Sequence, residues 1–468
     1  MLSKASNKAS LVPLSDVDLY YSLFKFKSAD VFLNSSIRLD KSAILKTIIK
    51  ILSLTNSSFS SIELRDILNQ TYDDQLIIIE EPKRGDADLA MPLFGLAKAL
   101  KQSPKDLFDY IKPLLIDYEM ISDIMFLNGF LNIYLKKEMF AKKVIEHIVT
   151  LDQLYGTSDI GHNQVVCMDY SSPNIAKSFS VGHLRSTVIG NALKKIYTKL
   201  GYKVIDINHL GDWGTQFGKM IVAYKKWGNP EAIKKNPITE LQKLYVKFHD
   251  EEKNDPTLEQ QGRDAFKKLE ENNKEYTDLW QYFKEESLKE FMVMYDILGV
   301  RFFSYAGESF YNDKMEDAVK KLDEKGLLKI DQGATIVDLG DDMPPALIKR
   351  SDGATLYMTR DLAALLYRYH TYDFKKILYV VGNEQKLHFK QLKRLSEKLG
   401  YDFDLEHINF GLVLVDGKKM STRKGKYTRL ESVIDQAIDS ALTQINEKNP
   451  ELKQKQEVSK AVGVGAII

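Results

Sequence analysis

The sequence contains almost no cysteine and no long hydrophobic run, and each absence excludes a class of protein. Cys167 is the single cysteine among 468 residues, so the chain cannot form an intramolecular disulfide framework or a thiolate-rich zinc site. One cysteine fits a reducing compartment. No apolar stretch approaches the ~20 residues that a membrane helix needs. Hydrophobic residues make up 44% and charged residues 28%, an ordinary mixture that excludes disordered and collagen-like chains.

An excess of charge of either sign is also missing. Lys and Arg together number 66 against 65 for Asp and Glu, which gives a net charge of +1. Any polyanion must therefore be bound by a local patch rather than by the field of the whole molecule. The first fifteen residues contain Lys4, Lys8 and four serines but no acid and no arginine. This composition favours a disordered polar tail over an organellar transit segment.

The N-terminal part of the chain predicts a small α+β domain over residues 39–140. Residues 1–38 have no clean periodicity and are interpreted as a disordered extension. The patterns predict helices at Ala43–Leu52, Ile62–Leu68 and Pro92–Lys101, and strands at Leu76–Ile79 and Phe126–Tyr134. A Gly85-Asp86 turn separates the first strand from the third helix.

From residue 141 onward the pattern is typical of a doubly wound, parallel-sheet α/β domain. Val165–Tyr170 is a compact apolar run that indicates a buried parallel strand, a helical pattern from about Gly182 ends at Leu200, and Lys203–Ile207 is the next strand. Residues 228–300 are charged and helical, which predicts a helical insertion. The alternation resumes with strands at Thr355–Thr359, Ile377–Val381 and Ile408–Val415, and helices at Asp361–Tyr369 and Leu387–Leu399. We therefore expect a Rossmann-like domain over 141–400, followed by a distinct region at 401–468.

The first chemical motif is Ser180-Val181-Gly182-His183, which follows a strand and opens a helix. Free backbone N–H groups and the positive end of a helix attract a phosphate, and glycine lets it approach the backbone closely. His183 would donate to a phosphate oxygen as charge develops in the transition state. The alternative for this motif alone is a tight helix start with a surface histidine.

The second motif is a loop rich in cations, Lys418-Lys419-Met420-Ser421-Thr422-Arg423-Lys424-Gly425. Its four cations could clamp a polyphosphate, and its two hydroxyl groups could add hydrogen bonds. Alone, it is more often a solvated basic loop.

Together, the two motifs resemble the paired signature sequences of class I aminoacyl-tRNA synthetases. The longer stretch Asp169-Tyr-Ser-Ser-Pro-Asn-Ile-Ala-Lys-Ser-Phe-Ser-Val-Gly-His-Leu-Arg-Ser-Thr187 is similar to the arginyl-tRNA synthetase family. Three further stretches carry the same resemblance: Gly211-Asp-Trp-Gly-Thr-Gln-Phe-Gly218, Ser351-Asp-Gly-Ala-Thr-Leu-Tyr-Met-Thr-Arg-Asp361 and Met420-Ser-Thr-Arg-Lys-Gly425. The resemblance extends from about residue 40 to the last residue.

The resemblance implies a ligase reaction. L-arginine and magnesium-bound ATP would give arginyl-adenylate and pyrophosphate, and the arginyl group would pass to tRNA(Arg), usually with tRNA required for the first step. It implies no protein-bound metal or prosthetic group and no membrane association. We expect a cytoplasmic monomer, with an organellar location as the alternative that the basic, Ser-rich N-terminus leaves open.

Two departures from the family's signatures concern the phosphate-binding residues. Ser180 stands where the first signature has histidine, and Thr422 stands where the second has lysine. In family members that lack this lysine, one just upstream of the first signature compensates, which here is Lys177. The resemblance assigns catalysis to His183, Lys177, Lys419, Ser421 and Arg423, and ATP binding to Ser180, Gly182, His183, His388, Met420 and Ser421. Lys424 is a further candidate cation.

Arginine recognition requires carboxylates, because guanidinium is a planar fork of donors that pairs bidentately. The resemblance places the guanidinium at Asp361 and Glu308, with Tyr357 lining the pocket. The alternatives are a helix cap for Asp361 and a turn residue for Glu308. The α-amino and carboxylate groups of the substrate would meet Asp169, Asn174, His183 and Gln385.

The N-terminal domain resembles the family's module for the tRNA elbow. Phe130 and Asn132 match positions that stack on and hydrogen-bond to an unpaired base, the usual way of recognising single-stranded RNA. Core packing for Phe130 and a strand-end turn for Asn132 are the alternatives. Family members continue into a helical domain that binds the anticodon. Because the sequence stops at the apolar Ala461–Ile468, we expect a chain that lacks this domain and charges tRNA weakly by itself.

Three functional hypotheses remain open at this point. The first is an active arginine–tRNA ligase, and intact signature loops favour it. The second is a truncated or inactive synthetase-like protein with an RNA-binding or regulatory role. The third is another class I ligase or nucleotidyltransferase, which would not need Asp361 with Tyr357 four residues before it.

Overall fold

The computed structural model describes Pro82 and residues 85–117, 120–351, 353, 356–411, 414–415, 418–419 and 428–468. It divides into two compact units, Met1–Ser158 and Asp159–Ile468, which we describe separately. The predicted extension at 1–38, the helices Ala43–Leu52 and Ile62–Leu68, and the strand Leu76–Ile79 lie outside the described residues.

The described part of the first unit is a three-stranded antiparallel sheet with helices. The strand order is β1-β3-β2. Its elements are β1 (Leu89–Pro92), α4 (Phe94–Leu100), α5 (Pro104–Leu115), β2 (Ile121–Leu127), β3 (Phe130–Leu135), α6 (Lys137–Leu151) and the short 3-10 helix η1 (Asp152–Leu154).

Two sequence predictions in this unit need correction. The single strand predicted over Phe126–Tyr134 is a β-hairpin, because Asn128 and Gly129 adopt φ values of 51° and 80°. Positive φ at both central residues gives the tight turn whose twist matches an antiparallel strand pair. The helix predicted from Pro92 begins at Phe94 instead, since Pro92 ends β1.

The second unit contains a four-stranded parallel sheet in the order β10-β9-β4-β5. The strands are β4 (Val165–Asp169), β5 (Lys203–Ile207), β9 (Lys376–Gly382) and β10 (Asp404–Phe410). From β4 the chain builds the sheet first toward β5 and later toward β9 and β10. The switch point therefore lies between β4 and β9, and in such sheets ligands bind at the carboxyl ends of the strands there. This confirms the predicted doubly wound fold.

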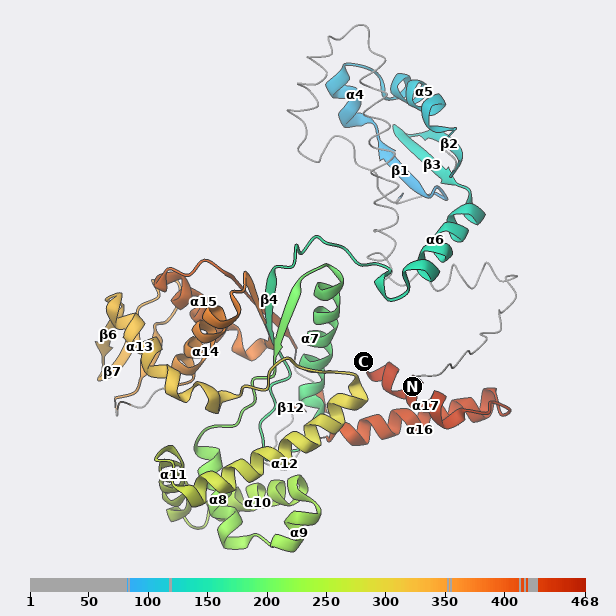
Figure 1. Ribbon diagram of the computed structural model, residues 1–468. Helices are drawn as coiled ribbons and strands as arrows, with labels where there is room; N and C mark the ends of the chain where they lie inside the picture. Colours follow the sequence, from blue (N-terminus) through green and yellow to red (C-terminus); the bar gives the residue numbers. More distant parts are fainter. Residues whose placement is uncertain are drawn as a thin grey trace, which may run out of the picture. The chain divides into compact units, whose positions relative to one another are not determined.

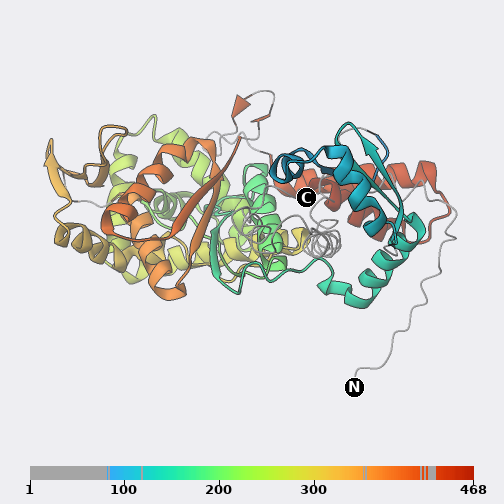
Figure 2. The same cartoon turned by 90° about the horizontal axis from the view of Figure 1, so that it is seen from above.

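Helices cover both faces of this sheet because successive strand residues point to opposite sides. Val166 and Met168 of β4 join the core that includes α7 (Val181–Lys199). Cys167 joins the opposite core with α14 (Tyr357–Tyr372) and α15 (Lys386–Leu399). Figure 1 shows α7 on one side of β4 and α14 with α15 on the other, and Figure 2 shows the same layers from above.

The helix α7 approaches β4 closely. At Gly190 a Cβ atom would lie 2.2 Å from the ring of Tyr170, so only glycine fits there. This contact sets the height of the helix over the sheet, and therefore the position of its N-terminus beside the end of β4.

The charged region after β5 is helical, as the sequence predicts. Its elements are α8 (Thr215–Trp227), α9 (Pro230–Lys235), α10 (Pro237–Glu251), α11 (Thr257–Glu270) and α12 (Lys274–Leu298). In Figure 1 these helices gather on one side of the unit, with α12 leading back toward the sheet.

The segment between α12 and α14 contains elements that the sequence analysis missed. They are the 3-10 helix η2 (Glu308–Lys314), α13 (Met315–Glu324) and an antiparallel meander of β6 (Leu328–Asp331), β7 (Ala334–Val337) and β8 (Ala346–Lys349). The strand predicted at Thr355–Thr359 is wrong for its described residues, since α14 begins at Tyr357. Buried Thr359 donates from Oγ1 to the Ile348 carbonyl, and this tertiary contact overrides its β-propensity.

The C-terminal part of the unit consists of two helices, α16 (Leu430–Lys448) and α17 (Lys455–Ile467), that lie side by side in Figure 1. The strand predicted over Ile408–Val415 is interrupted: β10 ends at Phe410, and β11 (Leu414–Val415) pairs antiparallel with β12 (Lys418–Lys419). Of the two terminal isoleucines, Ile467 packs against the core and Ile468 is half exposed.

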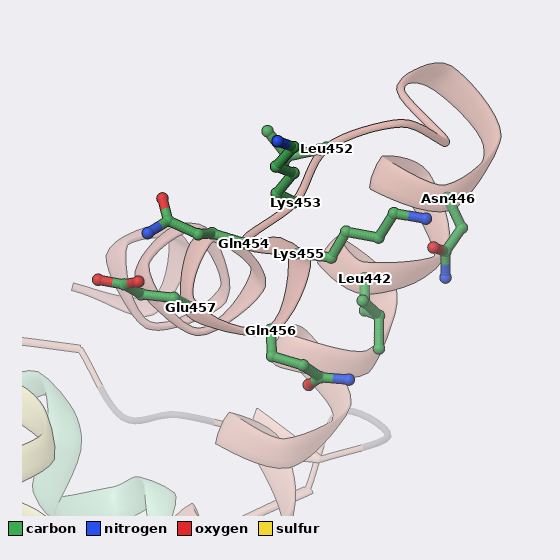
Figure 3. Close-up of a pocket in the computed structure, with 8 residues that line it drawn as sticks. All are labelled: Leu442, Asn446, Leu452, Lys453, Gln454, Lys455, Gln456 and Glu457. Carbon is green, nitrogen blue, oxygen red and sulfur yellow. The ribbon is translucent and has the colours of Figure 1, made fainter.

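A pocket lies at the turn between α16 and α17, away from the predicted site residues (Figure 3). Its lining residues are Leu442, Asn446, Leu452, Lys453, Gln454, Lys455, Gln456 and Glu457. None of the described helices is long and apolar enough to cross a membrane.

Candidate active site

The loop after β4 is held in an unusual backbone conformation. Ser171, Ser172 and Ala176 have φ values of 72°, 47° and 58°, a region that costs free energy for residues with a Cβ atom. A hydrogen-bond network offsets this cost. The backbone N–H of Ser171 donates to Ser186 Oγ at 2.9 Å, and the hydroxyl of Ser171 lies 2.8 Å from the hydroxyl of Tyr295. The loop is therefore fixed in shape before any ligand binds.

Ser180 and His183 form a reciprocal pair at the start of α7. The backbone N–H of Ser180 donates to His183 Nδ1 at 3.2 Å. Since Nδ1 accepts this bond, the neutral ring carries its proton on Nε2. Burial, with a smaller contribution from the charge of Lys177, lowers the pKa of His183 to about 4. At neutral pH His183 is thus a neutral ring that offers one N–H to a ligand.

The two signature loops are tied together. The Val181 N–H donates to the Thr428 carbonyl at 3.1 Å, and the Leu430 N–H donates to the Phe179 carbonyl at 3.0 Å. On the other side of the second loop, Arg185 Nη1 donates to the Gly411 carbonyl at 2.6 Å. Both stems of the second loop are therefore attached to the first loop and its helix.

Several predicted residues of the second loop lie outside the described residues. They are Met420, Ser421, Thr422, Arg423, Lys424 and the side chain of Lys419. Their roles rest on the resemblance of the sequence to the family.

Lys177 and Asn174 lie on the first loop and share a neighbour. Lys177 Nζ is 3.5 Å from Gln216 Oε1 and lies over the ring of Tyr245. The Gln216 amide donates to Asn174 Oδ1 at 3.5 Å, and Asn174 forms a backbone bridge with Gly211. The predicted cation and the predicted substrate ligand are thus both oriented by the start of α8.

Asp169, at the end of β4, is paired with an arginine that the sequence analysis missed. Arg368 of α14 is 1% exposed and its Nη1 donates to Asp169 Oδ2 at 2.8 Å. Its other nitrogens reach the Tyr311 hydroxyl at 3.3 Å and His209 Nδ1 at 3.2 Å. An isolated buried arginine is visible in sequence only as one more residue of an amphipathic helix, so no local signal indicated it.

Asp361 is held by two histidines. His388 Nε2 lies 2.5 Å from Asp361 Oδ2, and His209 Nε2 lies 3.9 Å from Oδ1. Burial would raise the pKa of Asp361, but the hydrogen bond from His388 and the electrostatic influence of His388, His209 and Arg368 outweigh it, so the pKa lies below its ordinary value. The N-cap of α14 is Leu356, so the alternative of Asp361 as a helix cap is wrong.

Glu308 is a buried carboxylate with an unsatisfied oxygen. The side chain is 7% exposed, and Oε2 has no hydrogen-bond partner among the described residues. Burial raises the pKa of Glu308 to about 7, the nearby charges of Asp361 and Asp212 add to this, and Arg360 opposes it. Its position is set by the neighbouring Ser309, whose N–H donates to Asp212 Oδ1 at 2.8 Å. A buried acceptor of this kind suits a cationic donor from a ligand.

Two other predicted residues lie at the surface of the second unit. Tyr357 begins α14 and is 64% exposed, and exposed Gln385 lies in the 3-10 helix η3 (Asn383–Gln385) after β9. In the first unit Phe130 makes an edge-to-face contact with Phe94, with ring centroids 5.8 Å apart. Asn132 is 8% exposed and donates to the Phe130 carbonyl. No group of three or more metal-ligating side chains occurs among the described residues.

A parallel sheet with the Ser180–His183 loop beside its switch point and the stems of the second signature loop attached to it is the arrangement expected of a class I aminoacyl-tRNA synthetase. The family model for the catalytic domain of class I (R) tRNA synthetases matches residues 144–468. A second model, for the arginyl tRNA synthetase N-terminal domain, matches residues 42–135. The chain belongs to the arginyl-tRNA synthetase family.

Curated relatives and solved structures agree with this assignment. An arginine–tRNA ligase of Enterococcus faecalis is 52% identical over 421 residues, which cover 89% of this chain and 75% of the relative. One from an Exiguobacterium species is 51% identical over 85% of this chain and 71% of the relative. The fold resembles the arginyl-tRNA synthetase of Thermus thermophilus, with a TM-score of 0.66 at 21% identity, covering 86% of this chain and 73% of that one. The activity of the family, arginine–tRNA ligation, is the one that the sequence predicts.

Proposed function

We propose that the second unit activates L-arginine with magnesium-bound ATP and transfers it to tRNA(Arg), with the residue roles given below. The arginine carboxylate attacks the α-phosphorus of ATP, the bond to the bridging oxygen breaks, and pyrophosphate leaves. A hydroxyl of the terminal ribose of the tRNA then attacks the arginyl carbonyl, and AMP leaves. The observation that carries this proposal is the buried oxygen of Glu308 that has no hydrogen-bond partner in the described part of the chain and lies close to the charge of Asp361.

On the arginine side, the guanidinium lies between Glu308 and Asp361. A guanidinium has five donors in one plane, so it can satisfy the free oxygen of Glu308 and bind Asp361 at the same time. His388, which the resemblance assigns to ATP binding, contacts Asp361, and this supports a role in orienting the carboxylate instead. Tyr357 closes the pocket from the first turn of α14.

The opposite end of the substrate arginine lies nearer the sheet. Asn174, Gln385 and His183 bind its α-amino and carboxylate groups. Asp169 contributes as well, although Arg368 already pairs with one of its oxygens and Ser172 donates to the other at 3.0 Å.

On the ATP side, the phosphates bind at the start of α7. The N–H groups around Ser180 and Gly182 face the anion, and the Nε2–H of His183 donates to an oxygen whose charge grows in the transition state. Because its pKa is lowered to about 4, His183 acts as a neutral donor throughout the physiological range. Lys177 supplies a cation from the same loop.

The second signature loop supplies the remaining contacts to ATP. Lys419 and Arg423 offer charge, Ser421 offers a hydroxyl donor, and Met420 packs beside the adenine. The attachment of both loop stems to the first loop supports a shared site.

The finer assignments extend the same proposal. Magnesium enters with ATP as part of the substrate. The chain acts as a monomer in the cytoplasm, where charged tRNA is used. In the first unit, Phe130 stacks on an unpaired base of the tRNA elbow and Asn132 hydrogen-bonds it.

Pyrophosphate exchange tests this function directly. Exchange of labelled pyrophosphate into ATP should require arginine and be stimulated by tRNA, and charging of total tRNA should consume arginine alone among the amino acids. Equal stimulation by cysteine or glutamate would reject the arginine assignment. Binding of tRNA without exchange under any condition would favour an inactive RNA-binding protein.

A further inference from the structure

A continuous set of side-chain contacts links the sheet to the arginine pocket. It runs from Asp169 at the end of β4 through Arg368 to His209, and from His209 to Asp361. Arg368 is 1% exposed, and its side-chain hydrogen-bond partners among the described residues are Asp169, Tyr311 and His209. Its charge lowers the pKa of Asp361 through space, whereas any influence that requires contact passes through His209.

The chemistry of this contact determines the state of His209. Arg368 has donors only, and its Nη2 lies 3.2 Å from His209 Nδ1. Nδ1 must therefore carry a lone pair, and the single proton of the neutral ring lies on Nε2. Nε2 is the nitrogen that faces Asp361 Oδ1, 3.9 Å away. The positive end of the N–H dipole thus points at one carboxylate oxygen, while His388 holds the other at 2.5 Å.

Without the donor from Arg368, the opposite tautomer would become accessible. It would turn the lone pair of Nε2 toward Asp361, which is repulsive, or allow the ring to take up a second proton and compete with the substrate cation. A lysine at position 368 could still neutralise Asp169, but a single ammonium cannot serve Asp169, Tyr311 and His209 as the planar fork does.

We propose that Arg368 is a positioning residue that locks His209 as the Nε2–H tautomer and thereby keeps Asp361 oriented for the substrate guanidinium. The inference rests on the function proposed above for Asp361. Arg368 itself neither touches the substrate nor takes part in the reaction.

The tautomer of His209 is observable without any assay of activity. Nitrogen-15 NMR of histidine-labelled full-length chain distinguishes protonated from unprotonated ring nitrogens, and loss of one of the eight histidine signals in a His209→Gln variant assigns the residue. At pH 7.5 we expect Nε2 protonated and Nδ1 bare. An Nδ1–H tautomer or a doubly protonated ring would overturn the proposal.

Steady-state kinetics test the consequence for the substrate. Arg368→Lys should raise KM for arginine roughly tenfold, the effect of about one lost contact to a charged group, with KM for ATP unchanged. The exposed Arg263 of α11, which pairs with Glu259, provides the matched control Arg263→Lys, in which neither constant should change.

A rescue experiment separates positioning from a general structural effect. Glutamine places an amide N–H2 near the position of histidine Nε2 and needs no tautomer lock. In a His209→Gln background, Arg368→Lys should therefore change KM for arginine less than about twofold. The effects of two substitutions are not additive when both residues act through one contact. If Arg368→Lys raised KM for arginine by the same factor in the wild-type and the His209→Gln backgrounds, the proposal would be refuted. Should Arg368→Lys fail to fold, the NMR measurement on the unmodified chain still decides.

Discussion

Replacement of Glu308 by glutamine should make the second unit more stable at alkaline pH while weakening arginine binding. In the folded chain the pKa of Glu308 is about 7, raised by burial from an ordinary value of 4.5. A shift of this size corresponds to about 3 kcal/mol of unfavourable free energy for the ionised form. Glutamine has nearly the same shape and never carries this charge.

The pH dependence has a definite sign. Between pH 4.5 and 7 the folded chain binds a proton at Glu308 that the unfolded chain has released, so stability falls as pH rises through this window. At pH 8 both states are ionised and the whole penalty is present. We therefore expect Glu308→Gln to raise the free energy of unfolding by up to about 3 kcal/mol at pH 8, and the difference should vanish near pH 4.5.

Urea unfolding followed by tryptophan fluorescence measures this effect in the relevant unit. The three tryptophans, Trp213, Trp227 and Trp280, all belong to Asp159–Ile468, so the signal is separate from the first unit. The control is Glu251→Gln, since Glu251 is an exposed residue of α10. The argument would be refuted if Glu308→Gln did not change the free energy of unfolding at pH 8. It would also be refuted if the change were the same at pH 5 and at pH 8.

The same carboxylate should make arginine binding depend on pH. Only ionised Glu308 attracts the guanidinium, so affinity should fall roughly tenfold between pH 8 and pH 6, where protonation exceeds ionisation by about that factor. The histidines near Asp361 also titrate, but they are present in both the wild-type chain and Glu308→Gln. The difference between the pH profiles of arginine affinity for these two proteins therefore isolates the contribution of Glu308. Identical profiles in calorimetric titrations would contradict this assignment.

Three further substitutions test the proposed roles. Asp361→Asn should raise the dissociation constant for arginine by about 30-fold or more, as expected for truncation of a charge-assisted pair, with ATP binding unchanged; retained arginine affinity in calorimetry would exclude Asp361 from the pocket. His183→Ala removes a donor that acts in the transition state, so kcat of pyrophosphate exchange should fall about 100-fold, and a change confined to KM for ATP would indicate a binding role only. Phe130→Ala should raise KM for tRNA by about tenfold, through loss of one stacked base, while thermal unfolding and tRNA-independent arginine binding stay the same; an unchanged KM for tRNA would favour core packing.

The sequence predicted the parts of the fold that depend on local pattern. The strand at Val165–Asp169, the helix that follows it and the strand at Lys203–Ile207 all lie where the apolar periodicity placed them. Their signals are strong because a buried parallel strand is continuously apolar and the helix ends before Gly201, whose φ is 81°. The position of the loop between them, to which we assign phosphate binding, was predictable for the same reason.

Other elements depend on contacts that sequence does not display. The start of α14 was misjudged because Thr359 is stabilised by a hydrogen bond to β8, which is formed only in the folded chain. The meander of β6, β7 and β8 is made of short strands, and Ile330 and Leu347 of these strands are exposed. Strands of four residues have too few positions for an alternating pattern to stand out from its surroundings.

The polar network of the site was the least predictable feature, and it underlies the selectivity that we propose for the pocket. Four carboxylates lie within it, and three have internal partners: Asp169 has Arg368, Asp212 has Lys284, and Asp361 has His388. The fourth, Glu308, has an oxygen without any partner among the described residues. Sequence shows these acids but not which of them is already neutralised.

This distribution of charge favours a substrate with a planar, multidentate cation. A neutral side chain would leave Glu308 buried and unpaired, and a site with an unsatisfied polar group rejects the analogue that cannot pair with it by large factors. A single ammonium could pair with Glu308 or with Asp361 but lacks the planar fork of donors that would reach both. In the proposed site a guanidinium would satisfy both at once, so we expect discrimination to come from the cost of the unpaired carboxylate rather than from the size of the cavity.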